Sequence, residues 1–470
     1  MFSFIKKADQ LSLEKTARLF VGKDFNVLLP GGRKRRFVNF DHAATTPPLR
    51  AVLDHVNSCT EWYSSVHRGA GLKSALTTQA HHEARETLGR FFDIDPDYHV
   101  LLFCGNTTDA INRMAAHMYD GDASSDGVVL CSVLEHHSNL LPWHGANMQV
   151  DHIRAKWPCG MLDLDHLEEQ LKKYEGRVRL VCITGASNIT GLIPKIAEAA
   201  ELAHAHGARI LVDAAQLAAH RSISMGKAGS PSCIDFLMFS GHKMYAPFGS
   251  GGLIGPREFF ESSTPAVKGG GAVDFVEFDR VEWAGLPDRE EAGTPNVLGI
   301  FAMAKAAEIL AALGMDAVAR HENDLMRRLT KGLKEIPELK LFGGCEKTDE
   351  MRRVAVQPIQ SSRYPHAHLA AILGHEWGIG VRNGCFCAQP YVGHLLQTTD
   401  EARERQRELM KQGDRGDMPG FVRISMGLPN TEKDVDWLLD ALKSIHEKGP
   451  QLSYNLNRVT GEYEPENTPS

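Results

Sequence analysis

The sequence has no long hydrophobic run, no excess of positive charge and few cysteines. None of its 470 residues lie in a stretch approaching the roughly 18 uninterrupted apolar residues that a transmembrane helix needs. The first residues lack the apolar core of a secretory signal peptide. Lys and Arg number 52 and Asp and Glu number 59, so the net charge is −7, which argues against binding nucleic acid through general basicity. We therefore expect neither a membrane nor a nucleic acid as a partner.

The nine cysteines are an odd number scattered through a long chain. Cys104, Cys131 and Cys182 lie in apolar runs that are typical of buried strands. This usage predicts reduced thiols and a cytoplasmic location. The apolar share of 43% and the charged share of 24% are ordinary for a globular protein, which excludes a disordered or collagen-like chain.

Short apolar runs alternate with longer amphipathic stretches in the first part of the chain. The expected strands are 99–104, 127–132, 179–184, 208–212, 234–239 and 250–254. Helical patterns at 108–119, 163–174 and 194–206 lie between several of them. Continuous apolar strands separated by helices predict an α/β fold with a mostly parallel sheet and helices on both faces. Ligands of such sheets bind beyond the carboxyl ends of the strands, so the residues that follow each strand are the candidates for chemistry.

The pattern changes after about residue 297. A long helical run at 297–336 precedes expected strands at 339–343 and 352–358 and a helix near 365–376, which together predict a second, smaller α+β domain. The first 35 or so residues read as helical and polar. The expected organisation is an N-terminal arm at 1–38, a large domain at 39–296, a small C-terminal domain at 297–450 and a flexible tail at 451–470.

A carboxylate and a lysine follow two of the expected strands. Asp213 comes directly after strand 208–212, and Lys243 follows strand 234–239 in the turn 240–243. A pyridoxal phosphate (PLP) enzyme needs this layout, because the lysine amine forms a Schiff base with the cofactor aldehyde and the aspartate pairs with the protonated ring nitrogen. On spacing alone, a surface lysine and a helix-capping aspartate are the more common explanation.

A candidate phosphate cradle changes that balance. Strand 99–104 is followed by the residues Gly-Asn-Thr-Thr at 105–108 and then by a helix. A helix N-terminus presents free N–H groups and a positive dipole end to an anion, and threonine hydroxyls add donors. An ordinary helix cap explains one hydroxyl. It does not explain the combination with Ser240 and His242 beside Lys243.

Ten short segments occur in the order of one known family across residues 40–430. They are 41–47, 66–69, 106–112, 135–139, 187–191, 212–216, 239–247, 291–296, 382–390 and 422–425. In these segments the chain resembles the class V aminotransferase family of fold-type I PLP enzymes. Within that family it is most similar to the cysteine desulfurase and selenocysteine lyase branch, nearest the SUF-type enzymes.

The resemblance implies a homodimer in which each chain has a large PLP domain and a small domain packed against the N-terminal arm. Lys243 would carry the cofactor and move protons, and His136 would stack on its ring. The implied cofactor site consists of Thr107, Thr108, His136, Asn188, Asp213, Gln216, Ser240, His242, Lys243 and, acting in trans, Thr294 of the partner subunit. The implied substrate site consists of Arg423, which would clamp the carboxylate, with Arg382, His67, Arg68 and Asn188.

The branch of the family depends on Cys387, which lies in the sequence Cys-Ala-Gln-Pro. In the SUF-type enzymes this thiol attacks the sulfur of bound L-cysteine, which yields alanine and an enzyme persulfide whose sulfur passes to a protein or small-molecule acceptor. Cys385 departs from the family, which usually has histidine there. A metal held by these thiols and His394 is disfavoured, because no second ligand pair follows at zinc spacing, so we expect no metal.

Cys387 and Arg423 are 36 positions apart, further than in the SUF-type enzymes. The surplus is the charged, helix-like stretch 396–418. It covers the mouth of the site, replaces a surface for a sulfur acceptor, or is a solvated excursion, and the sequence leaves these three options open.

Two other functions also stay open. One is another class V PLP enzyme, such as an aminotransferase, epimerase, selenocysteine lyase or C–S lyase, in which Cys387 is not a nucleophile. The other is a PLP-free protein that keeps the fold for partner binding. The presence of Lys243, Asp213 and Arg423 disfavours that last option, because a scaffold needs none of them.

Overall fold

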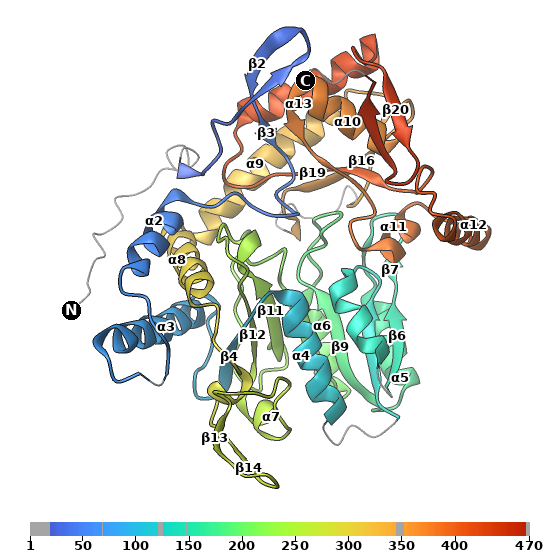
Figure 1. The fold of residues 1–470 in the computed structure, drawn as a ribbon. Helices are drawn as coiled ribbons and strands as arrows, with labels where there is room; N and C mark the ends of the chain where they lie inside the picture. The colour runs from blue at the N-terminus through green and yellow to red at the C-terminus, as the bar shows by residue number, and fades with distance from the viewer. Residues whose placement is uncertain (1–18, 68, 121–125, 146–147, 345–351, 467–470) are drawn as a thin grey trace.

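The computed structural model describes residues 19–67, 69–120, 126–145, 148–344 and 352–466. These residues form two lobes, a larger one built around a seven-stranded sheet and a smaller one built around a four-stranded sheet (Figure 1). The domain boundaries expected from the sequence stay predictions.

The large sheet has the strand order β4-β12-β11-β10-β9-β5-β6. Its strands are β4 (His99–Cys104), β5 (Val128–Ser132), β6 (Gln149–Ile153), β9 (Val178–Thr184), β10 (Arg209–Asp213), β11 (Phe236–Ser240) and β12 (Gly251–Pro256). All neighbours pair in parallel except β12, which is antiparallel to both β11 and β4. The expected mixed α/β architecture with a mostly parallel sheet is confirmed.

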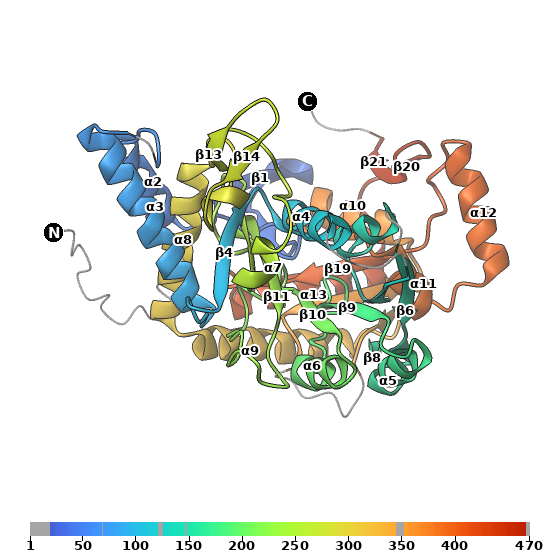
Figure 2. The same cartoon turned by 90° about the horizontal axis from the view of Figure 1, so that it is seen from below.

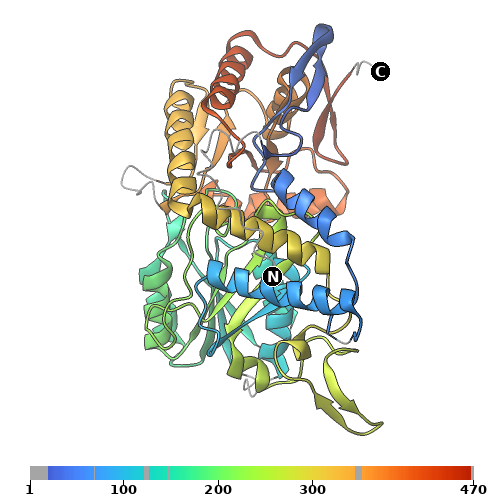
Figure 3. The same cartoon turned by 90° about the vertical axis from the view of Figure 1, so that its left-hand side faces the viewer.

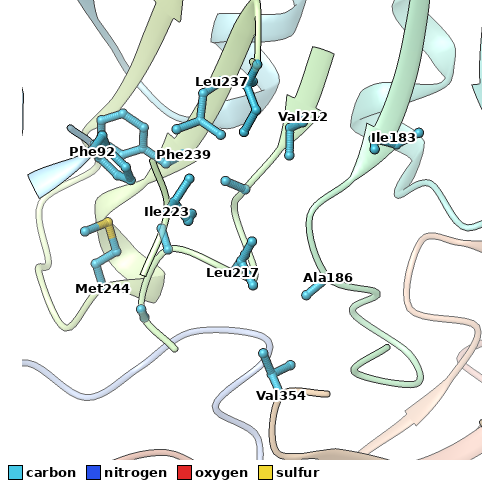
Figure 4. Close-up of a cluster of buried hydrophobic side chains, with 14 of the residues drawn as sticks. Phe92, Ile183, Ala186, Val212, Leu217, Ile223, Leu237, Phe239, Met244 and Val354 are labelled. Carbon is cyan, nitrogen blue, oxygen red and sulfur yellow. The ribbon is translucent and has the colours of Figure 1, made fainter. Parts of the chain in front are cut away.

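The strands of this sheet are apolar because helices cover both of its faces. Every residue of β4, β5 and β11 is buried. Helix α4 (Thr107–Asp120) lies on one face and α6 (Ile196–Ala205) on the opposite face (Figure 2). Side chains from successive strands meet in the core, as Figure 4 shows for Ile183, Val212 and Leu237. Full burial of each such side chain contributes roughly 1.5–3 kcal/mol.

Several further elements cover and connect the large sheet. They are α2 (Arg50–Thr60), α3 (Leu72–Phe91), α5 (Leu164–Lys173), α7 (Arg257–Glu261), the strand pair β7 (Ala155–Lys156) and β8 (Met161–Leu162), and the hairpin of β13 (Val273–Val276) and β14 (Val281–Trp283). The hairpin extends away from the rest of the large lobe (Figure 1).

Two long helices connect the lobes. The helical run expected at 297–336 is two helices, α8 (Val297–Leu313) and α9 (Met315–Leu333), because Gly314 has φ 81° and stops the first. Helix α8 packs beside α3 in the large lobe, and α9 runs toward the small lobe (Figure 3). Among the described helices none is individually long and apolar enough to cross a membrane, and the pair α8 and α9, bent by 78°, meets that test only when joined.

The small lobe holds an antiparallel sheet of order β15-β16-β19-β18. Its elements are β15 (Leu339–Leu341), β16 (Val356–Ser361), β18 (Arg382–Gly384), β19 (Phe421–Ser425), α10 (His366–Trp377), α11 (Gln389–Leu395), α12 (Asp400–Lys411) and α13 (Glu432–Lys448). Helices α10 and α13 cover it with buried leucines and isoleucines. In the surplus stretch 396–418 only α12 is helical, and none of its residues is buried.

Two terminal segments differ from the expectations. The part of the N-terminal arm that can be described forms a hairpin of β1 (Asn26–Leu29) and β2 (Arg33–Arg36) rather than a helix, and residues 1–18 lie outside the described residues. The arm joins the small lobe where β3 (Val38–Asn39) pairs with β17 (Ile379–Gly380).

The segment 451–470, expected as a loose tail, is instead a hairpin of β20 (Tyr454–Asn457) and β21 (Glu462–Pro465), with 467–470 outside the described residues. Two tyrosines anchor this hairpin. Tyr463 stacks on His368 with ring centroids 4.5 Å apart, and the Tyr454 hydroxyl donates to Glu376 (3.1 Å). Main-chain hydrogen bonds from Gln451 and Leu452 to Glu376 (2.9 and 3.0 Å) add to these contacts, so this mostly polar segment is attached to α10.

Candidate active site

Lys243 and Asp213 lie at the same edge of the large sheet, as their positions after two strands predict. Asp213 is the last residue of β10, and Lys243 ends a short 3-10 turn after β11. Burial lowers the pKa of Lys243 to about 8, opposed by the charge of Asp213. Burial raises the pKa of Asp213, opposed by a hydrogen bond from Ala215 N–H and by Lys243. Among the described residues, the one hydrogen-bond contact of the Lys243 amine is a long one, 3.5 Å to Gln216 Oε1, so this nitrogen can bond to a cofactor.

The N-terminus of α4 lies next to this lysine. Ser240 Oγ accepts a hydrogen bond from Thr107 N–H (2.8 Å), and the two hydroxyls are 2.7 Å apart. The exposed Thr108 hydroxyl pairs with Ser138 Oγ (2.7 Å). A hydroxyl-rich helix N-terminus that is open at Thr108 is suited to hold a phosphate. β12 can approach it closely because residue 251 is glycine, whose Cβ would lie 2.8 Å from Asn106 Cα.

Two histidines line the same space. Burial, followed by the charge of Lys243, lowers the pKa of His136 and of His242 to about 4 each. His136 Nδ1 accepts from Ser138 N–H (3.1 Å), which fixes the ring orientation. His242 Nδ1 is 3.2 Å from Thr45 Oγ1. Both imidazoles are therefore neutral near pH 7, and a neutral ring is suited to stacking on a flat cofactor.

Arg423 approaches from β19 in the small lobe. It is 2% exposed, and burial lowers its pKa to about 10, so it stays charged at neutral pH. Its Nη2 donates to Asp41 Oδ1 (2.9 Å), and its Nη1 donates to the main-chain oxygen of Asn188 (3.0 Å). Its Nε has no hydrogen-bond partner in the described part of the chain. This buried donor therefore lacks an acceptor, which a substrate carboxylate would supply. Arg382 donates to the other oxygen of Asp41 (2.9 Å).

The two cysteines that the sequence singled out differ in their surroundings. Cys387 is the only exposed cysteine among those described, whereas Cys385 is half-buried against the main core. Burial raises the pKa of Cys385, which makes its thiol a poorer nucleophile. Two hydrogen bonds hold the loop: His137 N–H donates to Cys387 O (2.7 Å), and Asn188 Nδ2 donates to Phe386 O (2.8 Å).

Other predicted residues lie apart from this group. His67 lies beside α3, with its Nδ1 3.8 Å from Asp288 Oδ1. Thr294 is exposed in the loop that follows the Arg85–Glu291 ion pair. In the described ranges no contact joins His67 or Thr294 to Lys243 or Arg423. Arg68 lies outside the described residues.

The structure adds three residues to which sequence reasoning assigned no role. Asp41 joins the two arginines of the substrate side, Ser138 joins Thr108 to His136, and Phe386 packs against Arg423. All three lie inside segments that carry the resemblance, and that was the available signal. Asp41 and Phe386 contact residues far away along the chain. No local spacing indicated their partners, which for Asp41 are 341 and 382 positions away.

One group of metal-type ligands occurs in the described residues, away from the predicted site. His204, Cys233 and Asp235 have ligand atoms within 4.8 Å of one another. Both His204 ring nitrogens already have partners, Pro231 O (2.7 Å) and Asp235 Oδ2 (2.8 Å). This group is explained as a hydrogen-bonded pair, His204 with Asp235, that ties α6 to the start of β11. Within the described chain, Cys385, Cys387 and His394 form no comparable group.

These residues fit PLP on three observations. Among the described residues the buried Lys243 amine has a single long contact, the buried carboxylate of Asp213 lies at the neighbouring strand end, and a hydroxyl-rich helix N-terminus is hydrogen-bonded to Ser240, three residues before Lys243. Such a site on such a sheet defines a PLP-dependent enzyme of fold type I.

Comparisons with known proteins agree. Residues 38–438 match the family described as Aminotransferase class-V. A probable cysteine desulfurase of Halalkalibacterium halodurans is 30% identical over 411 residues, which is 87% of this chain and 93% of that protein. The cysteine desulfurase of Klebsiella pneumoniae is 30% identical over 434 residues, covering 91% and 97%.

A solved structure is also similar. The apo cysteine desulfurase of Thermococcus onnurineus has a TM-score of 0.75 at 27% identity, covering 87% of this chain and 94% of that chain. The chain belongs to the class V aminotransferase family, and its cofactor is pyridoxal 5'-phosphate.

Proposed function

We propose that this protein is a cysteine desulfurase that converts L-cysteine to L-alanine and takes the sulfur onto Cys387 as a persulfide. The observation that carries the proposal is the exposed Cys387 thiol, held on a loop tied to the turn of His136 and to Asn188. The relatives named cysteine desulfurases cover nearly the whole chain, which supports the same assignment.

The carboxylate of the amino acid would bind at Arg423. The unpartnered Nε and the second Nη2 hydrogen form a planar fork that matches a carboxylate. Asp41 and Asn188 hold the guanidinium from its other sides, so the fork is oriented before substrate arrives. Arg382, which is more exposed, shares Asp41 and adds positive charge at the entrance.

Lys243 would bind the cofactor and then move a proton. Because burial lowers its pKa to about 8, a useful fraction of its amine is neutral near pH 7 and can accept a proton. Asp213 would hold the ring nitrogen, and Thr108, Ser240 and His242 would surround the phosphate. When bound, PLP supplies an electron sink that labilises bonds at the substrate α-carbon.

Sulfur transfer balances without an added oxidant. The Cys387 thiolate attacks the sulfur of L-cysteine, an S–S bond forms, and the C–S bond breaks with its electron pair going to the substrate β-carbon. Protonation of that carbon completes L-alanine, and Cys387 carries the persulfide. Because this step needs a reduced thiol, the proposal includes a reducing compartment such as the cytoplasm.

The proposal includes a homodimer with shared sites. Thr294 would complete the phosphate site of the partner subunit, which explains why it is exposed and apart from Lys243 in its own chain. The hairpin β13–β14 supports such a contact, because Phe275, Val276 and Phe278 are at least half exposed, and exposed apolar patches mark association surfaces. A protein or small-molecule acceptor would then collect the sulfur from Cys387.

The test is release of alanine and sulfide from L-cysteine in the presence of a thiol reductant. Cys387→Ser should lower desulfuration on the order of 10²–10⁴-fold, the range that a positioned catalytic group contributes. Cys385→Ser is the matched control. It should change the rate little, because that thiol is packed against the core.

In Cys387→Ser, the shift of the cofactor absorption band on adding L-cysteine should persist, because Lys243 and Arg423 are untouched. Unchanged desulfuration in that variant would refute the persulfide step. Loss of activity only in Cys385→Ser would move the nucleophile to Cys385. Full activity of Cys387→Ser on L-selenocysteine, or on another amino acid, would favour a different enzyme of the family.

A further inference from the structure

Phe386, between the two cysteines, lies against the arginine that the proposed function assigns to the substrate carboxylate. The guanidinium carbon of Arg423 is 4.6 Å from the centroid of the Phe386 ring. Phe386 is 8% exposed, so this cation–π contact is largely shielded from water. Such contacts are stronger when they are shielded from water. Because Phe386 directly precedes Cys387, this contact links the guanidinium of Arg423 to the loop that carries the thiol.

Asn188 connects the same two residues a second time. Its main-chain oxygen accepts from Arg423 Nη1 (3.0 Å), and its side-chain Nδ2 donates to Phe386 O (2.8 Å). Asn188 is buried, so these two hydrogen bonds have little competition from water. Any displacement of the Arg423 guanidinium thus acts on the ring and on the backbone of Phe386 together.

The backbone at this point is held in an uncommon conformation. Phe386 and Cys387 both have φ 54°, in the left-handed region that non-glycine residues disfavour. The backbone of Cys387 is held by a hydrogen bond that His137 N–H donates to Cys387 O (2.7 Å). A strained pair of residues persists only where surrounding contacts enforce it. Here the enforcing contacts come from Arg423, Asn188 and His137, so a change at Arg423 releases part of the constraint.

We infer that Phe386 is a positioning residue that couples carboxylate binding at Arg423 to the placement of the Cys387 thiol. A bound carboxylate pairs with the guanidinium and weakens its attraction to the ring. The loop then gains freedom, and the thiol moves more easily when substrate is present. Coupling of this kind is reciprocal, so the loop also tunes carboxylate affinity. The inference rests on the proposed function for the roles of Arg423 and Cys387.

The experiment measures alkylation of Cys387 by iodoacetamide in the holoenzyme, followed by mass mapping of the Cys387 peptide. Acetate is the probe, because it has a carboxylate but no side chain that reaches the thiol, and sodium chloride at equal ionic strength is the control. The limiting rate at alkaline pH is compared, since there the thiol is fully ionised and changes of its pKa drop out. No turnover is needed.

Two substitutions distinguish coupling through the aromatic face of Phe386 from simple covering of the thiol by a bulky side chain. Phe386→Leu keeps a buried apolar side chain and removes the aromatic face, whereas Phe386→Tyr keeps the face. Saturating acetate should raise the limiting alkylation rate at least about threefold in the wild type and in Phe386→Tyr, and should leave it unchanged in Phe386→Leu. Because the ring contact that the carboxylate weakens must in turn oppose carboxylate binding, the KM for L-cysteine should fall roughly 3–10-fold in Phe386→Leu and return to the wild-type value in Phe386→Tyr, a size within the range of a cation–π contact.

An acetate effect of the same size in all three proteins would show direct action at the thiol and would overturn the inference. Absence of the effect in the wild type would overturn it as well. Unfolding midpoints of the three proteins establish that Phe386→Leu is folded. Failure of the proposed function would appear elsewhere, as unchanged desulfuration in Cys387→Ser, so the two failures are distinguishable.

Discussion

His81 on α3 should make the protein sensitive to mild acid. Its side chain is fully buried, its ring lies 5.0 Å from that of Phe103, and neither ring nitrogen has a hydrogen-bond partner among the described residues. Burial is the main cause that lowers its pKa to about 3, and the positive charges of Arg85, His67 and His82 lower it further. The folded protein therefore keeps this ring neutral in conditions where the unfolded chain binds a proton.

The size of the effect follows from that pKa. Between pH 6.5 and pH 3 the unfolded state binds more protons at this position than the folded state, so the free energy of unfolding falls as the pH falls. At pH 5 the loss is about 2 kcal/mol, from 1.5 pH units at about 1.36 kcal/mol each, and it is near zero above about pH 7.5. His42 is also buried, with a pKa lowered to about 4, and it lowers the free energy of unfolding by a similar amount at pH 5. That contribution is the same in the wild type and in a variant that changes only His81.

The perturbation is His81→Leu, which keeps a similar volume and removes the titrating ring. Urea unfolding of the holoenzyme, followed by tryptophan fluorescence at fixed protein concentration, gives the free energy of unfolding at each pH. Relative to the wild type, the variant should lose about 2 kcal/mol less between pH 7.5 and pH 5. His152→Leu is the matched control, because that ring is exposed and not buried. Equal pH dependence in the wild type and His81→Leu would refute the reasoning.

Two further predictions concern the cofactor and the dimer. Borohydride should fix the cofactor on the peptide that contains Lys243, and Lys243→Ala should lose the absorption band of the covalently bound cofactor, because no other amine follows that strand; labelling of a different lysine would contradict the assignment. Mixing subunits that carry Lys243→Ala with subunits that carry Thr294→Ala should produce hybrids with one intact site and regained activity, measured as sulfide release after subunit exchange. A fully active monomer in solution would exclude the trans role of Thr294.

Much of the large lobe could be predicted from the sequence because its strands are buried on both faces. A strand such as β5 must be apolar along its whole length, and such a run is visible without any tertiary information. Asp213 and Lys243 lie at the ends of two neighbouring strands of this kind. Because ligands bind at the carboxyl edge of such a sheet, their positions in the sequence predicted that the two residues share one site.

The small lobe and the termini were predicted less well. The hairpin at 454–465 is held by aromatic contacts to α10, and nothing in its own polar composition indicates a partner surface. The break at Gly314 was missed for a different reason, since a helix on either side of a glycine has the same periodicity as one continuous helix.

What the sequence by itself determined is the chemistry available: a lysine and an aspartate at strand ends, hydroxyls at a helix N-terminus, and a cysteine in a short loop. What only the tertiary structure decided is how the groups of the two lobes constrain one another. Asp41 shares its carboxylate between Arg382 and Arg423, and Phe386 packs beneath Arg423 with a left-handed backbone. These contacts join positions that are far apart along the chain, so no local pattern encodes them. They form only when folding brings the segment after β3, the sheet of the small lobe and the cysteine loop together around one guanidinium.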